Sequence, residues 1–208
     1  MADMQSFIAD PVIADLAASP LAGHRERGTF GASPEGGPGV TLSERFGLAI
    51  AEATAWRGSE TRIRLAIKSA AGLSLRTEPG AGVIKGETAA FNIGPGRYLV
   101  SGTKDGLVAA LDAASGGDGT VTDLSHGRSA IRIDGPQSRW VLAKLFPVDF
   151  ADEVFAKGNG VATAHHDILA QIQRVGADAF DVYVFRSFAR SFWHLLCRSA
   201  GEVGYRVD

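Results

Sequence analysis

Ser125 and His126 are neighbours that supply a hydroxyl and an imidazole, two groups that nucleophilic catalysis commonly uses. Adjacency in sequence does not make a catalytic dyad, because the role of each group depends on geometry in the fold. Cys197 lies in an apolar helical stretch without an adjacent base, which predicts a buried and inert thiol. The sequence therefore predicts no catalytic residue in this chain.

The densest cluster of possible metal ligands is His165-His166-Asp167. We expect these residues in a strand, where neighbouring side chains point to opposite faces and two adjacent imidazoles cannot chelate one ion. His165 and Asp167 would share a face, but a third ligand is missing nearby. The cluster predicts polar surface residues at the start of a strand rather than a metal site.

A glycine-rich stretch, Gly80-Ala-Gly82-Val-Ile-Lys-Gly86, resembles a dinucleotide-binding fingerprint superficially. Its last spacing is one residue too long, and it leads into an expected strand, whereas a phosphate-binding loop opens a helix. We therefore expect no phosphate loop and no cofactor bound by this chain.

Strand and helix patterns alternate from Val40 onward. In one expected helix, Ile63, Ile67 and Ala70 recur at helical spacing, and Gly72 suits the helix end. The Pro-Gly pair in Ile93-Gly-Pro-Gly96 predicts a tight reversal. The expected strands are 48–56, 83–93, 97–101, 120–124, 129–134, one long strand within 161–175, 179–185 and 203–207, and the expected helices are 59–71, 105–114, 137–145 and 187–199.

This element order predicts an α+β fold made of two ferredoxin-like β-α-β-β-α-β halves with antiparallel sheets. The expected division is an extended or flexible N-terminal arm over residues 1–40, a first half over 41–126 and a second half over 127–208. The two halves repeat the order of their elements more than their sequence.

Two apolar segments suggest contact with another protein. The N-terminal one is either a flexible tail or an arm that orders on a partner, and the last helix, with its broad apolar sector, is either a well-buried core helix or one whose outer flank meets another subunit. The expected partner contacts are Phe7, Ile8, Val12, Ile13, Leu16, Arg190 and Trp193.

Composition narrows the class of protein. The 208 residues carry 21 Lys plus Arg and 23 Asp plus Glu, a formal net charge of −2, which provides no bulk field for nucleic acid or an anionic membrane. The single cysteine cannot form an internal disulfide, which fits a reducing compartment. No apolar stretch approaches the ~18 residues of a membrane span, and the N-terminus does not read as a secretory signal. We expect a cytoplasmic protein.

Several segments together resemble known families. The run from Val121 to Pro136, then Trp140 to Leu142, resembles the folate-binding family of the glycine-cleavage aminomethyltransferase, as does Arg174 to Phe180. With Ile93-Gly-Pro-Gly-Arg-Tyr-Leu99 included, residues 40–208 are most similar to the gamma-subunit family of heterotetrameric sarcosine oxidase.

The resemblance implies a small subunit that assembles with alpha, beta and delta subunits. In that family the complex demethylates sarcosine oxidatively to glycine and passes the one-carbon unit to tetrahydrofolate. FAD, FMN, NAD and the tetrahydrofolate site are carried by other subunits.

One departure from the aminomethyltransferases bears on function. Those enzymes have an Asp-Asp pair at the start of the strand before the later hairpin, and the corresponding positions here are Ile168 and Leu169. Aliphatic side chains cannot accept a hydrogen bond from a pterin or bear charge beside a developing iminium. The resemblance therefore implies a non-catalytic subunit that acts in assembly and stability.

Two other hypotheses remain open at this stage. The chain could be a stand-alone tetrahydrofolate-binding one-carbon protein that uses Asp123 to His126, with Arg128 or Arg174 as a glutamyl or pterin partner. It could also be a self-associating α+β module without a small ligand.

Overall fold

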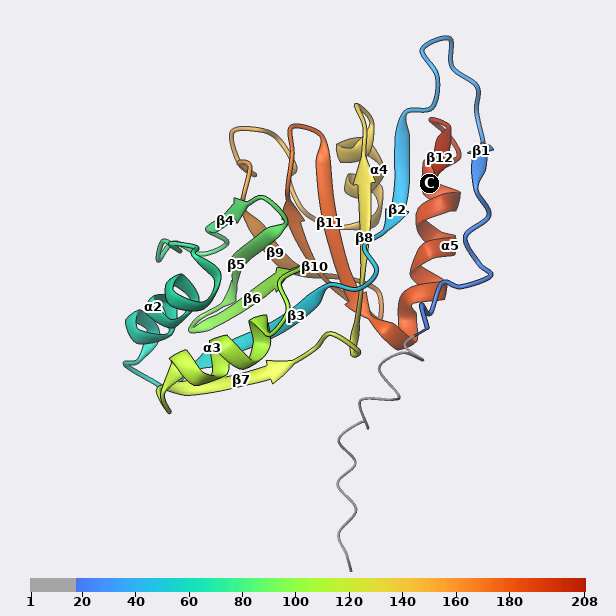
Figure 1. Cartoon of the computed structure of the whole chain (residues 1–208). Helices are drawn as coiled ribbons and strands as arrows, with labels where there is room; N and C mark the ends of the chain where they lie inside the picture. Colours follow the sequence, from blue (N-terminus) through green and yellow to red (C-terminus); the bar gives the residue numbers. More distant parts are fainter. Residues whose placement is uncertain (1–17) are drawn as a thin grey trace, which may run out of the picture.

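Two β-sheets stand side by side in the computed structural model, which describes residues 18–208 (Figure 1). The smaller sheet has the strand order β4-β5-β6-β3-β7, and two helices, α2 and α3, cover one of its faces. Its elements are β3 (Ala49–Ala55), α2 (Glu60–Ala71), β4 (Gly82–Lys85), β5 (Thr88–Gly94), β6 (Arg97–Gly102), α3 (Leu107–Ser115) and β7 (Gly119–Asp123).

The larger sheet has the order β1-β12-β2-β8-β11-β10-β9 and packs against α4 and α5. A short 3-10 turn, η1 (Arg186–Phe188), leads from β11 into α5. The other elements are β1 (Gly28–Phe30), β2 (Val40–Glu44), β8 (Arg128–Asp134), α4 (Ser138–Leu145), β9 (Gly160–His165), β10 (Ile168–Arg174), β11 (Ala179–Phe185), α5 (Ala189–Ala200) and β12 (Tyr205–Val207). Among residues 18–208, no helix combines the length and apolarity needed to cross a bilayer.

Side-chain periodicity explains which faces are buried. In α2 the residues Ile63, Ala66, Ile67 and Ala70 form one buried stripe, and Gly72 ends the helix with a φ of 70°. In β8, Ile131 and Ile133 point into the core under α4 and α5, while the intervening Arg132 points to the opposite face. The expected α+β class with two sheets is thus what the chain adopts.

The predicted pair of equivalent halves needs refinement. Strands β5, β6, β3 and β7 are adjacent in the order expected of a ferredoxin-like unit. In the larger sheet, however, β2 stands between β8 and β12, pairing antiparallel with β8 and parallel with β12. A strand at the start of the predicted first half thus joins the second sheet, and the division into two ferredoxin-like halves is not confirmed.

Two predicted strands are each a hairpin. The stretch expected as one strand over 83–93 is β4 and β5, with a turn at Gly86 whose φ is 60°. The long strand expected within 161–175 is β9 and β10, with a turn at His166, a non-glycine residue with φ 49°. Histidine tolerates the left-handed region better than β-branched residues do, but its presence does not signal a turn in sequence.

A third apolar cluster joins the two sheets. It consists of Leu48, Ile50, Phe91, Leu99, Ala130 and Tyr183. The Phe91 and Tyr183 rings lie 6.3 Å apart, and the Tyr183 hydroxyl hydrogen-bonds the Ser101 hydroxyl at 2.9 Å with both side chains buried. Burial raises the pKa of Tyr183 well above its ordinary value, so this phenol stays neutral and available for the hydrogen bond.

Glycines let the two sheets approach at their other contact. A Cβ at Gly82 would overlap the Gly158 carbonyl oxygen, and a Cβ at Gly160 would overlap the Phe91 ring. The Gly160 amide also donates to the Gly80 carbonyl at 2.8 Å. The glycine-rich stretch that begins at Gly80 therefore serves close packing between the two sheets.

Replacing Ser101 with alanine tests the polar contact between the sheets. The change strands the buried Tyr183 hydroxyl, and we expect S101A to lower the free energy of unfolding by about 2 kcal/mol. Ser129 is the matched control, since both serines are 4% exposed but the Ser129 hydroxyl has no hydrogen-bond partner among the described residues. S129A should change stability by less than about 0.5 kcal/mol in urea denaturation, and equal losses in the two variants would contradict the assignment.

Replacing Gly160 with alanine tests the steric contact. The added methyl group would force the Phe91 ring aside, and overpacking of this kind costs about 2 kcal/mol. Gly36 is the control, because a Cβ there meets no atom within 4 Å. Thermal unfolding should show a clear loss of stability for G160A and almost none for G36A, and a G160A protein as stable as the parent would show that the sheets are not in tight contact there.

Candidate functional site: a cleft where the chain crosses between the sheets

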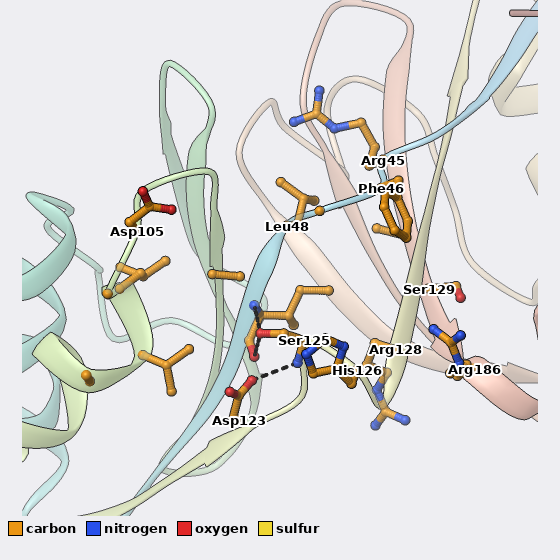
Figure 2. A pocket seen from close by; sticks show the side chains of 18 of the residues that line it. Arg45, Phe46, Leu48, Asp105, Asp123, Ser125, His126, Arg128, Ser129 and Arg186 are labelled. Carbon is orange, nitrogen blue, oxygen red and sulfur yellow. Dashed lines mark hydrogen bonds between the residues drawn. The ribbon is translucent and has the colours of Figure 1, made fainter. Parts of the chain in front are cut away.

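A large cleft lies where the chain passes from one sheet to the other (Figure 2). It has a volume of about 1050 Å³ and is bordered by the β2–β3 link, the β7–β8 loop and the start of α3. Polar groups of both signs line it together with exposed Phe46. The labelled lining residues are Arg45, Phe46, Leu48, Asp105, Asp123, Ser125, His126, Arg128, Ser129 and Arg186.

Asp123 and Ser125 hold the β7–β8 loop in shape. The Asp123 carboxylate accepts a hydrogen bond from the Ser125 backbone N–H at 2.9 Å, and the Ser125 hydroxyl accepts one from the Ile50 backbone N–H at 3.0 Å (Figure 2). His126 is exposed, and no hydrogen bond joins it to Ser125 in the described part of the chain. These groups serve the loop and form no nucleophile–base pair.

Arg128 is the cleft residue with the most unusual surroundings. Its guanidinium lies 3.5 Å from the centre of the Phe185 ring, and its Nε and Nη1 atoms are buried without a hydrogen-bond partner among residues 18–208. Burial lowers the pKa of Arg128 from its ordinary value, which nearby Glu52 partly offsets. The group remains a cation at neutral pH, so the cleft wall carries a half-buried positive charge that lacks a counter-ion within the described chain.

Two other arginines close to the junction are already paired. Arg132 makes a two-pronged contact with buried Asp181, with N–O distances of 2.7 and 2.9 Å, and this hydrogen bonding raises the pKa of Arg132. Arg45 bonds to Glu87 and lowers the pKa of that carboxyl. Neither guanidinium is therefore as available to a ligand as that of Arg128.

Arg174 is a structural clamp. It is 7% exposed, donates to the backbone carbonyls of Phe155, Gly176 and Ala177, and pairs with Asp152 at 2.6 Å. It also lies far from Arg128 in the cleft. Arg174 pairs with Phe180 of β11, and Arg128 pairs with Phe185 of the same strand. Phe180 and Phe185 are five residues apart, which is about 17 Å along a strand. The Arg174 side chain is thus engaged within the chain, and this geometry gives no support to the hypothesis that it binds a glutamyl or pterin group.

The histidine pair His165-His166 and the Cys197 thiol both lie outside the cleft. His165 lies at the end of β9, its Nδ1 2.6 Å from the Leu145 carbonyl oxygen, and its ring centre is 4.6 Å from that of His166. The two rings do not point to opposite faces as predicted, because His166 lies in the turn. No group of three or more potential metal ligands occurs among residues 18–208. Partial burial raises the pKa of Cys197 to about 11, so this thiol is protonated at neutral pH.

The predicted partner contacts divide between described and undescribed residues. Trp193 is 2% exposed and packs in the core under the larger sheet, so the core-helix interpretation holds for this side chain. Arg190 is exposed and donates from Nε to the Pro20 carbonyl at 2.9 Å. The remaining contacts, Phe7, Ile8, Val12, Ile13 and Leu16, lie outside the described residues.

A second, smaller cavity of about 530 Å³ lies between α2, the β5–β6 turn and β9. The predicted Pro95-Gly96 turn forms part of its wall, together with Tyr98 and Val161. Its walls are mainly apolar, and no cluster of groups in it has a catalytic arrangement.

The two positions at which the resemblance to the aminomethyltransferases led us to expect an acidic pair lie at the start of β10. Ile168 packs against the core of the larger sheet, whereas Leu169 is 55% exposed. Both side chains are aliphatic and neither offers a polar atom to a pterin.

Comparison with known proteins identifies the family. Residues 58–202 match the profile of the sarcosine oxidase, gamma subunit family. The chain belongs to this family. It is 33% identical over 127 residues to a sarcosine oxidase subunit gamma of an Arthrobacter species, a match that covers 60% of this chain and 62% of that relative. A Corynebacterium (strain U-96) subunit gamma is 29% identical over 147 residues, or 70% of this chain and 71% of the relative.

Solved structures agree with this membership. A chain of the heterotetrameric sarcosine oxidase from Corynebacterium sp. U-96, solved with pyrrole 2-carboxylate, superposes with a TM-score of 0.76 and 28% identity over 90% of this chain and 96% of that chain. Aminomethyltransferase T of the glycine cleavage system from Bartonella henselae superposes with a TM-score of 0.59 and 14% identity, over 82% of this chain and 48% of that chain. The gamma-subunit resemblance and the aminomethyltransferase-like fold are confirmed.

Proposed function

We propose that this chain is the gamma subunit of a heterotetrameric sarcosine oxidase and acts in assembly and stability rather than in catalysis. The observation that carries the proposal is the match to a chain of the Corynebacterium heterotetramer over nearly the whole of both chains. The proposed partners are the alpha, beta and delta subunits, and the proposed location is the cytoplasm.

In this proposal the complex converts sarcosine to glycine and transfers the released one-carbon unit to tetrahydrofolate. FAD, FMN, NAD and tetrahydrofolate are held by the other subunits. The geometry of the cleft supports a non-catalytic role, because Asp123 and Ser125 are used to shape a loop. Aliphatic Ile168 and Leu169 support the same role, since the resemblance to the aminomethyltransferases implies acids at these two positions.

The alternative is a tetrahydrofolate-binding protein that acts alone. The cleft volume and the free N–H groups of Arg128 favour it, whereas the use of Arg174 as a clamp counts against it. Calorimetry of the isolated full chain with tetrahydrofolate separates the two, since a stoichiometric binding heat would favour the alternative and overturn the proposal.

Co-purification tests the proposed subunit role and its N-terminal contacts. The full chain, tagged after Asp208, is co-expressed with the partner subunits, and we expect it to retain them in equal amounts. Replacing Phe7, Ile8, Val12, Ile13 and Leu16 together with serine should reduce retention at least tenfold, since five apolar contacts contribute more than the ~1.4 kcal/mol that a tenfold change requires. A Gln5→Ala/Ser6→Ala variant is the control and should retain the partners fully.

Two results would count against this scheme. A full chain that retains no partner would contradict the subunit role itself. Full retention by the five-serine variant would leave that role intact and would place the contacts elsewhere on the chain.

A further inference from the structure

The larger sheet has one face without a helical cover near the cleft. Along β10 and β11 alternate residues pack in the core under α4 and α5, including Ala170, Ile172, Val182 and Val184. The intervening residues point to the opposite face. On that face Tyr183 is covered by the smaller sheet, but the ends of the strands beyond it are open.

Strand register gathers three side chains at this open end. Phe185 on β11 pairs directly with Arg128 on β8. On the other side of β11, Val184 pairs with Ala170 of β10. Because the two strands are antiparallel, the neighbouring residues Phe185 and Leu169 then also lie opposite each other. Directly opposed residues of antiparallel strands share a face. Leu169, Phe185 and Arg128 therefore form a row across three strands, which we call the open row.

The open row exposes unusual apolar area. Leu169 is 55% exposed and Phe185 is 37% exposed, and both lie in strands of the larger sheet. Phe46, which is 56% exposed, lines the same cleft as Arg128, whereas exposed Leu65 lies on α2 beside the smaller sheet. Neighbouring apolar side chains next to an arginine are typical of the energetic centre of a protein interface.

Charge indicates what the row would bind. Arg128 has two buried N–H-bearing atoms without a partner and makes no ion pair in the described chain, and burial of an unpaired cation is unfavourable. The nearby carboxylate of Glu52 is already bonded to Arg97, at 2.8 Å from Nε and 2.7 Å from Nη2. A carboxylate from outside the chain would accept hydrogen bonds from the Arg128 guanidinium and neutralise its charge.

We infer that the open row of Leu169, Phe185 and Arg128 is a docking surface for a partner subunit that presents an aspartate or glutamate flanked by apolar side chains. The carboxylate binds Arg128, and the apolar groups cover Leu169 and Phe185. This inference rests on the proposed function, because it assigns a contact surface for the subunit assembly.

Paired substitutions in the co-expressed complex test the apolar part of this surface. L169K places a second cation in the open row and removes apolar contact, and we expect at least a tenfold rise in the dissociation constant of the tagged chain from its partners. L65K is the matched control, because Leu65 is 58% exposed and lies on α2 of the other sheet. It should leave the dissociation constant within twofold of the parent.

The charge is tested in the same assay with Arg128→Gln. We expect at least a tenfold weakening that Arg128→Lys restores in part, since lysine keeps the charge but loses the planar fork. Arg76→Gln serves as the control, because Arg76 is exposed and makes only a 3.9 Å ion pair with Glu78. Equal affinity of L169K, R128Q and the parent would overturn the inference.

A photo-crosslinking amino acid in place of Leu169 provides a readout that does not depend on the stability of the variants. In the intact complex it should crosslink to a different chain, whereas the same group in place of Leu65 should not. An intact complex without this crosslink, or a crosslink to a second copy of this chain, would overturn the docking surface and leave the proposed function standing. Failure of the unchanged chain to form any complex would overturn both.

Discussion

The close contact between the two sheets is the constraint on which the remaining features depend. Gly82 and Gly160 allow backbone and the Phe91 ring to approach without a Cβ between them, and the buried Tyr183–Ser101 hydrogen bond joins the sheets across the apolar cluster. A displacement at either contact would leave a cavity or a stranded hydroxyl, both of which are unfavourable. The sheets are thereby held in one arrangement, which fixes the cleft at the crossing points of the chain.

That arrangement gives the chain a fold similar to that of aminomethyltransferase T of the glycine cleavage system. In the cleft, the Asp123 carboxylate and the Ser125 hydroxyl accept hydrogen bonds from backbone N–H groups, and Arg174 holds its own hairpin and the loop around Phe155. Function has to be argued from the site rather than the fold, and here the features without an internal explanation are an unpaired guanidinium and exposed apolar side chains. Both features support the proposal that another protein covers this surface.

Local patterns in the sequence predicted much of the fold. The features that they missed depend on how strands distant in sequence pair with one another. The stripe of Ile63, Ile67 and Ala70 and the alternation around Arg132 depend on neighbours along the chain, so helix α2 and strand β8 were predictable. The turn at His166 and the insertion of β2 beside β12 depend on tertiary contacts. The open row was missed for the same reason, because Leu169, Phe185 and Arg128 meet only through strand register.

The central claim, that this chain contributes assembly rather than catalysis, is tested most directly by leaving it out. The partner subunits are expressed with and without it, and native mass spectrometry is combined with sarcosine-dependent turnover per bound flavin. The account predicts incomplete particles without this chain, whose residual turnover is lost rapidly on mild heating and is restored when the purified full chain is added back. An intact, heat-stable and fully active oxidase that lacks this chain would contradict the account.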